Sequence, residues 1–220
     1  MGWYGTILLK MLHVERFINQ LMTSNCYMVV DEETKHCFCI DPASEKSERE
    51  IAYIEQKGLT LDYIILTHEH TDHTWGVNAL IERFPNAKVV CSEVCKKNLA
   101  KEFQAYFLFY YDNLDYHYSV CQVDITVEEL KGLLEWGDYF MEFFPTPGHS
   151  MGSVSIALNG MLFTGDAIMQ TKPYINKRNG SKELFYKSAK NVIETFPLKT
   201  MVYPGHGDPF RLEDYKRNNI

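Results

Sequence analysis

The sequence predicts an α/β fold in which short strands alternate with helices. Apolar runs of strand length recur along the chain and are separated by turn-forming residues. One of them, at 61–67, is apolar almost throughout, which is typical of a strand covered on both faces. The chain has 220 residues, of which 45% are hydrophobic, so it can bury a substantial core. We expect a single domain over residues 1–220.

The first third of the chain is expected to form a β-meander followed by a β-α-β unit. Its strands are predicted at 11–20, 26–31 and 36–41. Ser44 or Ser47 is expected to cap the following helix, which Gly58 would end. The spacing of Ile51 and Ile54 turns both side chains toward the core.

The middle of the chain continues the alternation of strands and helices. After the strand at 61–67 we expect a helix at 76–84, a strand at 87–92 and a short helix at 93–100. The carboxyl ends of strands are where α/β folds usually place their ligands. The residues that follow position 67 are therefore candidates for a functional site.

The segment 103–118 is unusually rich in phenylalanine and tyrosine. Helical spacing fits its earlier part. The segment would either pack on the core or in a homodimer contact, or form a lid that faces a substrate. The sequence leaves both interpretations open.

The second half repeats the strand theme. We expect a helix at 181–196 and strands at 139–150, 152–160, 161–167 and 200–206. Three of these strands end in a histidine or aspartate beside a glycine. No linker or low-complexity tract divides this half from the first.

Charge and hydropathy exclude several classes of partner. The formal net charge is −7 and no basic run exists, so nucleic-acid binding is disfavoured. No apolar stretch is long enough to span a membrane, and the first residues do not resemble an export signal. We therefore expect a cytoplasmic protein that acts on a small molecule.

The six cysteines are scattered through apolar neighbourhoods. Without an export signal, reduced core thiols are the expected state. A structural zinc site at the Cys37/Cys39 or Cys91/Cys95 pair is the less favoured alternative, because neither pair has a closely spaced second pair.

Four residues directly behind the strand at 61–67 have side chains that bind metals: His68, His70, Asp72 and His73. In an extended loop, residues two apart point the same way, so His68 and His70 can bind one cation together. Asp72 and His73 are adjacent and would diverge toward a second cation. The spacing suits two metals better than one.

Further ligands should come from elsewhere, because a metal in a protein usually has four or five contacts. His149, Asp166 and His206 each follow a strand-like run and stand beside glycine. The two oxygens of Asp166 can bridge two cations, and imidazoles suit zinc, with iron or manganese as alternatives. A lone histidine is more often a hydrogen-bonding residue, and we assign His13, His36 and His117 to that class.

Four segments carry a resemblance to a known family: THEHTDHTWG at 67–76, PTPGHSMGS at 145–153, LFTGDA at 162–167 and YPGHGDP at 203–209. They resemble the signature of the metallo-β-lactamase fold superfamily, in its glyoxalase II-like branch. The resemblance implies a four-layer αββα sandwich, with two mixed sheets and helices on the outer faces. It also implies three ligand roles: His68, His70 and His149 for the first metal, Asp72, His73 and His206 for the second, and Asp166 as the bridge.

Asp41 lies in the stretch CIDPA, which resembles a strand-end motif of the same family. It would either support the ligands from beneath or simply begin the turn before Pro42. The sequence leaves both interpretations of Asp41 open.

A dinuclear centre of this kind predicts hydrolysis. Two divalent cations stabilise a shared hydroxide near neutral pH and polarise a carbonyl group. Asp72, as the catalytic residue, is placed to orient this metal-bridging hydroxide. The predicted function is therefore cleavage of a thioester, as in glyoxalase II, or of a related ester.

The sequence leaves three alternatives to a thioesterase open. The first is a lactonase, and the second is a mononuclear iron persulfide dioxygenase of the same fold that uses His68, His149 and Asp166. The third is a non-catalytic metal-binding module, which the seven filled ligand positions disfavour.

The residues after Asp166 differ from the glyoxalase II pattern, and the chain ends shortly after His206, so glutathione thioesters are only weakly favoured over other substrates. Three basic residues follow Asp166 in the sequence: Lys172, Lys177 and Arg178. They would either recruit an anionic substrate or form a solvated turn.

Overall fold

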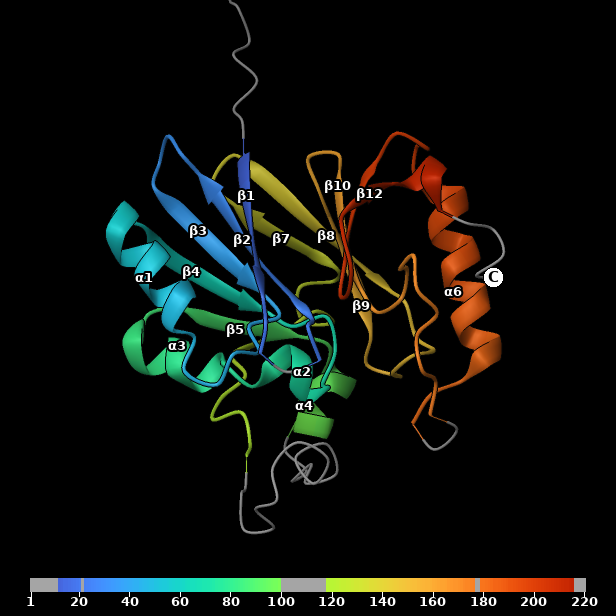
Figure 1. Cartoon of the computed structure of the whole chain (residues 1–220), viewed down its shortest axis with the longest axis horizontal. Helices are drawn as coiled ribbons and strands as arrows, with labels where there is room; N and C mark the ends of the chain where they lie inside the picture. The colour runs from blue at the N-terminus through green and yellow to red at the C-terminus, as the bar shows by residue number, and fades with distance from the viewer. Residues whose placement is uncertain (1–11, 21, 100–117, 177–178, 216–220) are drawn as a thin grey trace, which may run out of the picture.

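The computed structural model describes residues 12–20, 22–99, 118–176 and 179–215. These residues form two six-stranded sheets that pack face to face (Figure 1). In the first sheet the strands follow one another in sequence order: β1 (Leu12–Ile18), β2 (Asn25–Asp31), β3 (His36–Ile40), β4 (Thr60–Ile65), β5 (Lys88–Cys91) and β6 (Ile125–Thr126). The pairs β1–β2 and β2–β3 are antiparallel, and the pairs from β3 to β6 are parallel.

The second sheet is also mixed. Its strands are again neighbours in sequence order: β7 (Leu133–Trp136), β8 (Tyr139–Pro145), β9 (Val154–Leu158), β10 (Met161–Gly165), β11 (Met201–Pro204) and β12 (Phe210–Arg211). Only β10 and β11 pair in parallel among these described strands. A parallel pair needs a crossover connection, and here the helix α6 (Lys182–Thr195) lies in that connection.

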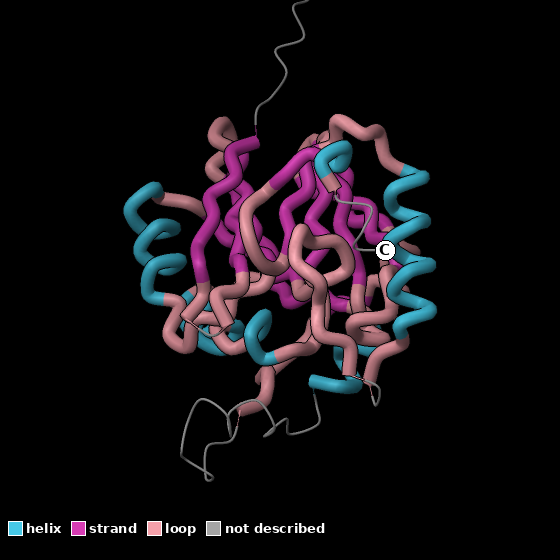
Figure 2. Tube along the Cα trace, turned by 45° about the vertical axis from the view of Figure 1, so that its right-hand side comes forward, coloured by secondary structure: helices cyan, strands magenta, loops and turns pink. Residues whose placement is uncertain are grey.

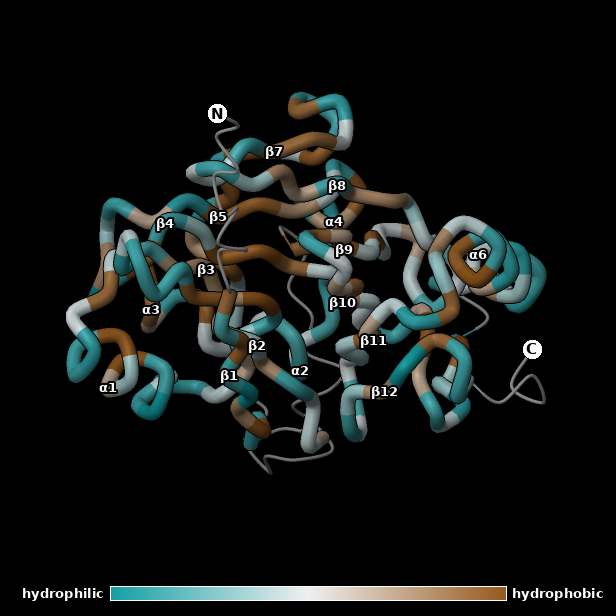
Figure 3. Tube along the Cα trace, turned by 90° about the horizontal axis from the view of Figure 1, so that it is seen from above, coloured by the Kyte–Doolittle hydropathy of each residue, from teal (hydrophilic) through white to brown (hydrophobic). Residues whose placement is uncertain are grey.

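Helices cover the outer faces of both sheets, as the αββα prediction requires. Figures 2 and 3 show the strands in the middle of the molecule with helices on either side. On the first sheet these are α1 (Glu48–Lys57), α3 (Val77–Arg83) and α4 (Glu93–Leu99), whereas α6 covers the second sheet. The short helix α2 (Thr71–Thr74) and the 3-10 turn η1 (Leu212–Asp214) complete the described elements.

Strand β4 and Leu66 after it show how the first sheet buries apolar side chains on both of its faces. Leu61, Ile64 and Leu66 pack with the helices on the outer side of the first sheet. Tyr63 and Ile65 face the other way and join the cluster between the two sheets. The apolar run at 61–67 is therefore covered on both faces, as predicted.

Helix α1 differs from its predicted start. Ser47 is at the N-cap position, but its φ of 43° is left-handed and its side chain makes no cap hydrogen bond. Its hydroxyl donates to the carbonyl oxygens of Ser44 and Gly76 instead, at 3.2 and 3.3 Å. The predicted serine cap is thus wrong for the side chain, because a tertiary contact takes its hydroxyl. Gly58 ends the helix as predicted, with a φ of 62°.

The cysteines behave as core residues. Cys26, Cys37, Cys39, Cys91 and Cys95 are buried and free, and all five belong to the cluster beneath the helices of the first sheet. Burial raises the pKa of Cys37 above the range in which thiols ionise at neutral pH. These thiols are structural, as expected.

Two further sequence predictions concern the aromatic segment and membrane spans. The aromatic segment 103–118 lies outside the described residues except for Tyr118, whose ring packs beside Ala43 and Trp75. In the part of the chain that the structure describes, no helix is long and apolar enough to cross a membrane.

Candidate metal centre

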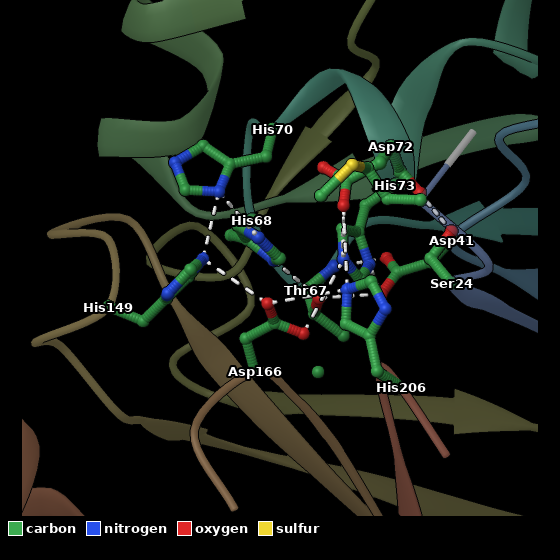
Figure 4. A network of polar contacts seen from close by, with 12 residues as sticks. Ser24, Asp41, Thr67, His68, His70, Asp72, His73, His149, Asp166 and His206 are labelled. Atoms are coloured by element: carbon green, nitrogen blue, oxygen red, sulfur yellow. Dashed lines mark hydrogen bonds and ion pairs between the residues drawn. The ribbon is translucent and has the colours of Figure 1, made fainter. Parts of the chain in front are cut away.

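The predicted ligands lie where strands of both sheets end. His68 and His70 follow β4, His149 follows β8, and Asp166 and His206 follow β10 and β11. Backbone contacts join the sheets at this edge: Val154 N donates to Thr67 O at 2.9 Å and Asn25 N to Gly205 O at 2.7 Å. The seven side chains therefore meet at one edge of the sandwich (Figure 4).

The segment that follows β4 is not the extended loop that we predicted. His70 is the N-cap of α2, and Asp72 and His73 are inside that helix. The two neighbours do not diverge: His73 Nε2 lies 3.8 Å from Asp72 Oδ2. The tight helical turn brings both side chains to the same group of atoms.

A first group of potential ligand atoms consists of His68, His70 and His149. Nδ1 of His70 lies 3.1 Å from His68 Nε2 and 2.8 Å from His149 Nε2. His68 is fully buried, whereas His70 is only partly buried. Three imidazole nitrogens thus converge from two segments of the chain.

A second group consists of Asp72, His73 and His206. Nε2 of His206 lies 3.4 Å from Asp72 Oδ2. Asp166 lies between the groups: its Oδ2 is 3.3 Å from His149 Nε2 and 3.6 Å from His206 Nε2, and its Oδ1 is 3.5 Å from His73 Nε2. Asp166 therefore lies between the two groups, and its bridging role stays a prediction.

Asp41 supports the histidines from beneath. Its Oδ2 lies 2.9 Å from His73 Nδ1 and accepts from Thr67 Oγ1 at 2.6 Å, while its Oδ1 accepts from Thr67 N at 2.8 Å. Thr67 Oγ1 lies 3.0 Å from His68 Nδ1. These contacts hold both imidazole rings in place, with His68 Nε2 and His73 Nε2 on the side of the ligand groups. Of the two interpretations of Asp41, the supporting one holds.

Replacing Asp41 with asparagine should weaken cation binding at the second group by about 10–100-fold. Asparagine tolerates the left-handed backbone of this residue, whose φ is 54°, but places an amide donor where an acceptor is needed. Chelator competition measures the affinity. Asp62→Asn is the matched control, because Asp62 accepts from His36 and Trp136 away from the centre. An unchanged affinity in Asp41→Asn would contradict the assigned role.

Burial and charge shift the pKa values of the histidines in opposite directions in the two groups. Burial is the main cause that lowers the pKa of His68, His70 and His149, and the pKa of His149 falls to about 4. These rings are neutral at pH 7 and can offer lone pairs. At His73 burial also opposes the charged form, but Asp166, Asp72 and Asp41 outweigh it and raise the pKa to about 10.

The pKa of Asp72 lies below its usual value. Burial opposes this shift, but the imidazoles of His73 and His206 outweigh it. The second group therefore stabilises positive charge.

The donor set fits divalent cations. His73 Nε2 and Asp166 Oδ1, both buried at the centre, have no hydrogen-bond partner among the described residues. Buried polar atoms are normally paired, and an ion is one explanation for an exception. Imidazole and carboxylate ligands suit zinc, iron and manganese.

Gly148 fixes the turn that carries His149. Its φ is 145°, and a Cβ atom added there would overlap the backbone of Phe185 in α6. Ser181 N also donates to Gly148 O at 2.8 Å. The start of α6 thus packs directly on the turn before the histidine.

Gly148→Ala should lower the free energy of unfolding by about 3 kcal/mol, since strain and overpacking act together. Gly137→Ala is the matched control, because Gly137 also has a positive φ of 56° but open space around it. We expect about 1 kcal/mol for this control. Urea unfolding measures both, and equal losses would contradict the close approach.

Several residues of the site are not predicted from the sequence. Ser24 Oγ donates to Asp72 O, and a β-bridge pairs Ser24 with His206. Glu69 and Ser150 contact each other between the two segments of the first group. Glu69 and Ser150 both stand in segments that resemble the family signature, but no metal-ligand spacing marks either of them, and Ser24 lies outside those segments. Lys177 and Arg178 of the predicted basic group lie outside the described residues, and Lys172 is exposed.

Comparison with known proteins decides the family. The sequence model of the Metallo-beta-lactamase superfamily matches residues 20–206, which include all seven predicted ligands. The chain belongs to the metallo-beta-lactamase superfamily. The predicted family and the αββα fold are thereby confirmed.

Two relatives from the superfamily match most of this chain. Persulfide dioxygenase ETHE1, mitochondrial, from Bos taurus is 28% identical over 183 residues, which cover 82% of this chain and 62% of the relative. A hydroxyacylglutathione hydrolase from Buchnera aphidicola subsp. Schizaphis graminum is 29% identical over 187 residues, which cover 84% of this chain and 63% of that protein. This chain thus spans less than two thirds of the length of both relatives.

A solved structure matches over nearly its whole length. The crystal structure of BLEG-1 B3 metallo-beta-lactamase has a TM-score of 0.80 and 26% sequence identity, and the match covers 91% of this chain and 95% of that one. The similar proteins are thus a dioxygenase, a hydrolase and a β-lactamase. Membership of the superfamily does not fix the reaction of this chain, which depends on the chemistry of its site.

Proposed function

We propose that this protein is a metal-dependent hydrolase that binds two divalent cations, with zinc as the first candidate, and cleaves a thioester or a related ester. The observation that carries the proposal is the completeness of the second group. The ligand atoms of Asp72, His73 and His206 lie within 4.8 Å of one another, as do those of the three histidines of the first group. A mononuclear oxygenase has no need of this second set.

The residues divide the work as follows. His68, His70 and His149 would hold one cation, Asp72, His73 and His206 the other, and Asp166 would contact both. When bound, the cations would acidify a water molecule and polarise the carbonyl group of the substrate.

Asp72 would orient the attacking water, because its carboxylate stays ionised beside His206. His70 and His206 are the partly exposed members of the set, so a substrate would approach from their side. We retain a small molecule as the substrate and the cytoplasm as the proposed location.

A second candidate is a persulfide dioxygenase that uses one iron. The 28% identity to ETHE1 favours it. In this chain His149 and Asp166 lie 3.3 Å apart and His68 belongs to the same histidine group, so a three-ligand set for iron is present. Lactone and β-lactam hydrolysis use the same centre as the thioesterase and differ only in the substrate.

A substrate panel tests the proposal. Zinc-loaded and iron-loaded protein would each be given a hydroxyacyl-glutathione thioester, a lactone, a β-lactam and, with an oxygen electrode, glutathione persulfide. We expect the zinc form to cleave the thioester fastest and neither form to consume oxygen. No hydrolysis by protein with two cations bound would defeat the hydrolase, and oxygen uptake with one iron would establish the second candidate.

A further inference from the structure

Glu69 is a buried carboxylate that has no part in either ligand group. It stands between His68 and His70 in the chain, and only 5% of it is exposed. A buried charge is costly unless hydrogen bonds compensate it. The contacts of Glu69 therefore indicate what its burial achieves.

Two segments donate hydrogen bonds to this carboxylate. Asn98 Nδ2, from α4, donates to Oε1 at 2.7 Å. The hydroxyl of Ser150 lies 2.7 Å from Oε1 and 2.6 Å from Oε2, so it donates between the two oxygens. Ser150 directly follows His149 in the chain. Glu69 thus links the segment of His68 and His70 to the segment of His149.

The loop 149–153 is fixed by further contacts on the same side. Ser150 Oγ accepts from Gly152 N at 2.9 Å, and Ser92 Oγ donates to Gly152 O at 2.7 Å. A Cβ atom added to Gly152 would lie 2.9 Å from Glu69 Oε2 and 2.8 Å from Cys95 N. The loop is therefore packed against Glu69 and α4 with no room for a side chain at position 152.

The first ligand group needs this link because its histidines come from segments far apart in the sequence. His149 Nε2 must stay close to His70 Nδ1, and the two atoms lie 2.8 Å apart. Binding constellations lose affinity when supporting residues let them shift by about 0.5 Å.

We propose that Glu69 is a positioning residue that sets the cation affinity of the first group by holding the loop 149–153 against the segment of His68 and His70. The inference rests on the proposed metal centre and adds a residue to it that the ligand pattern does not contain. Ser150 is the partner through which Glu69 acts on His149.

Titration with cobalt(II) chloride tests this role, because the visible absorption of cobalt reports both affinity and coordination geometry. Glu69→Ala and Ser150→Ala should each weaken one of the two binding events by about 10–100-fold and change its spectrum. The double variant should bind no more weakly than Glu69→Ala, since both changes remove the same link. Glu69→Gln keeps an acceptor for Ser150 and should recover much of the affinity.

The exposed Glu82 on α3 provides the control, and Glu82→Gln should titrate like the wild type. Thermal unfolding of the metal-free variants separates positioning from stability. If Glu69→Ala lowers the unfolding temperature but keeps the wild-type cobalt affinity and spectrum, the positioning role is wrong.

Failure of this inference differs from failure of the proposed function. A wild-type protein that binds two cobalt ions and hydrolyses none of the panel would defeat the hydrolase and leave the role of Glu69 intact. Wild-type hydrolysis together with unchanged cobalt binding in Glu69→Ala would do the reverse.

Discussion

Replacing Asp166 with asparagine should abolish turnover and weaken cation binding by about 100-fold or more. The carboxylate of Asp166 lies between the two groups, within 3.6 Å of imidazole nitrogens from His73, His149 and His206. Asparagine has the same shape but only one oxygen and no charge, so it cannot serve both cations. Changes to supporting residues alone cost 10–100-fold in comparable sites, so a direct ligand should cost at least the upper end.

Both effects of Asp166→Asn are measurable on one preparation, by elemental analysis and by the rate on the best substrate of the panel. Asp214→Asn is the matched control, because Asp214 is an exposed aspartate on η1. It should keep wild-type metal content and rate. Full activity of Asp166→Asn at native metal content would contradict the bridging role.

Removing the cations should lower the unfolding temperature by about 10 °C. A ligand held at a thousand times its dissociation constant stabilises the folded state by about 4 kcal/mol. For a chain of this size each kcal/mol corresponds to about 2–4 °C. The ligands come from the ends of β4, β8, β10 and β11 and from α2, so bound cations would tie both sheets together.

Calorimetry of chelator-treated protein, before and after zinc is restored, measures this shift. Magnesium is the control ion, because it prefers oxygen ligands to imidazole. Zinc should restore the unfolding temperature and magnesium should not. An identical response to both ions would show that the stabilisation does not come from these histidines.

The strands and the ligands were predictable because both depend on local pattern. The apolar run at 61–67 and the histidine-rich residues behind it predict a strand with a site at its end. The sequence does not predict the short strands β6, β7 and β12, because segments of two to four residues carry little pattern of their own. They are strands because their neighbours in the sheets pair with them.

The local conformation at the site was less predictable than its residues. The segment behind β4 was expected to be extended, yet Thr71–Thr74 form the turn α2. A single helical turn is too short for a periodic pattern to reveal. The serine cap of α1 failed for a related reason, because Ser47 bonds to Gly76, which is distant in sequence.

The supporting residues depend on contacts between distant segments. Asp41 and His73 are 32 residues apart, and Glu69 and Ser150 are 81 apart. Only the family resemblance drew attention to Asp41. Glu69 stands between two predicted ligands in the sequence, but its partners Asn98 and Ser150 are known only from the fold. A sequence pattern locates the ligands, whereas the fold shows what holds them.

The most direct test is the metal content of the protein purified without added metal, measured by elemental analysis together with protein concentration. The geometry of the two ligand groups predicts two divalent cations per chain. A preparation that holds a single iron, or that takes up no zinc when zinc is supplied, would contradict the dinuclear centre.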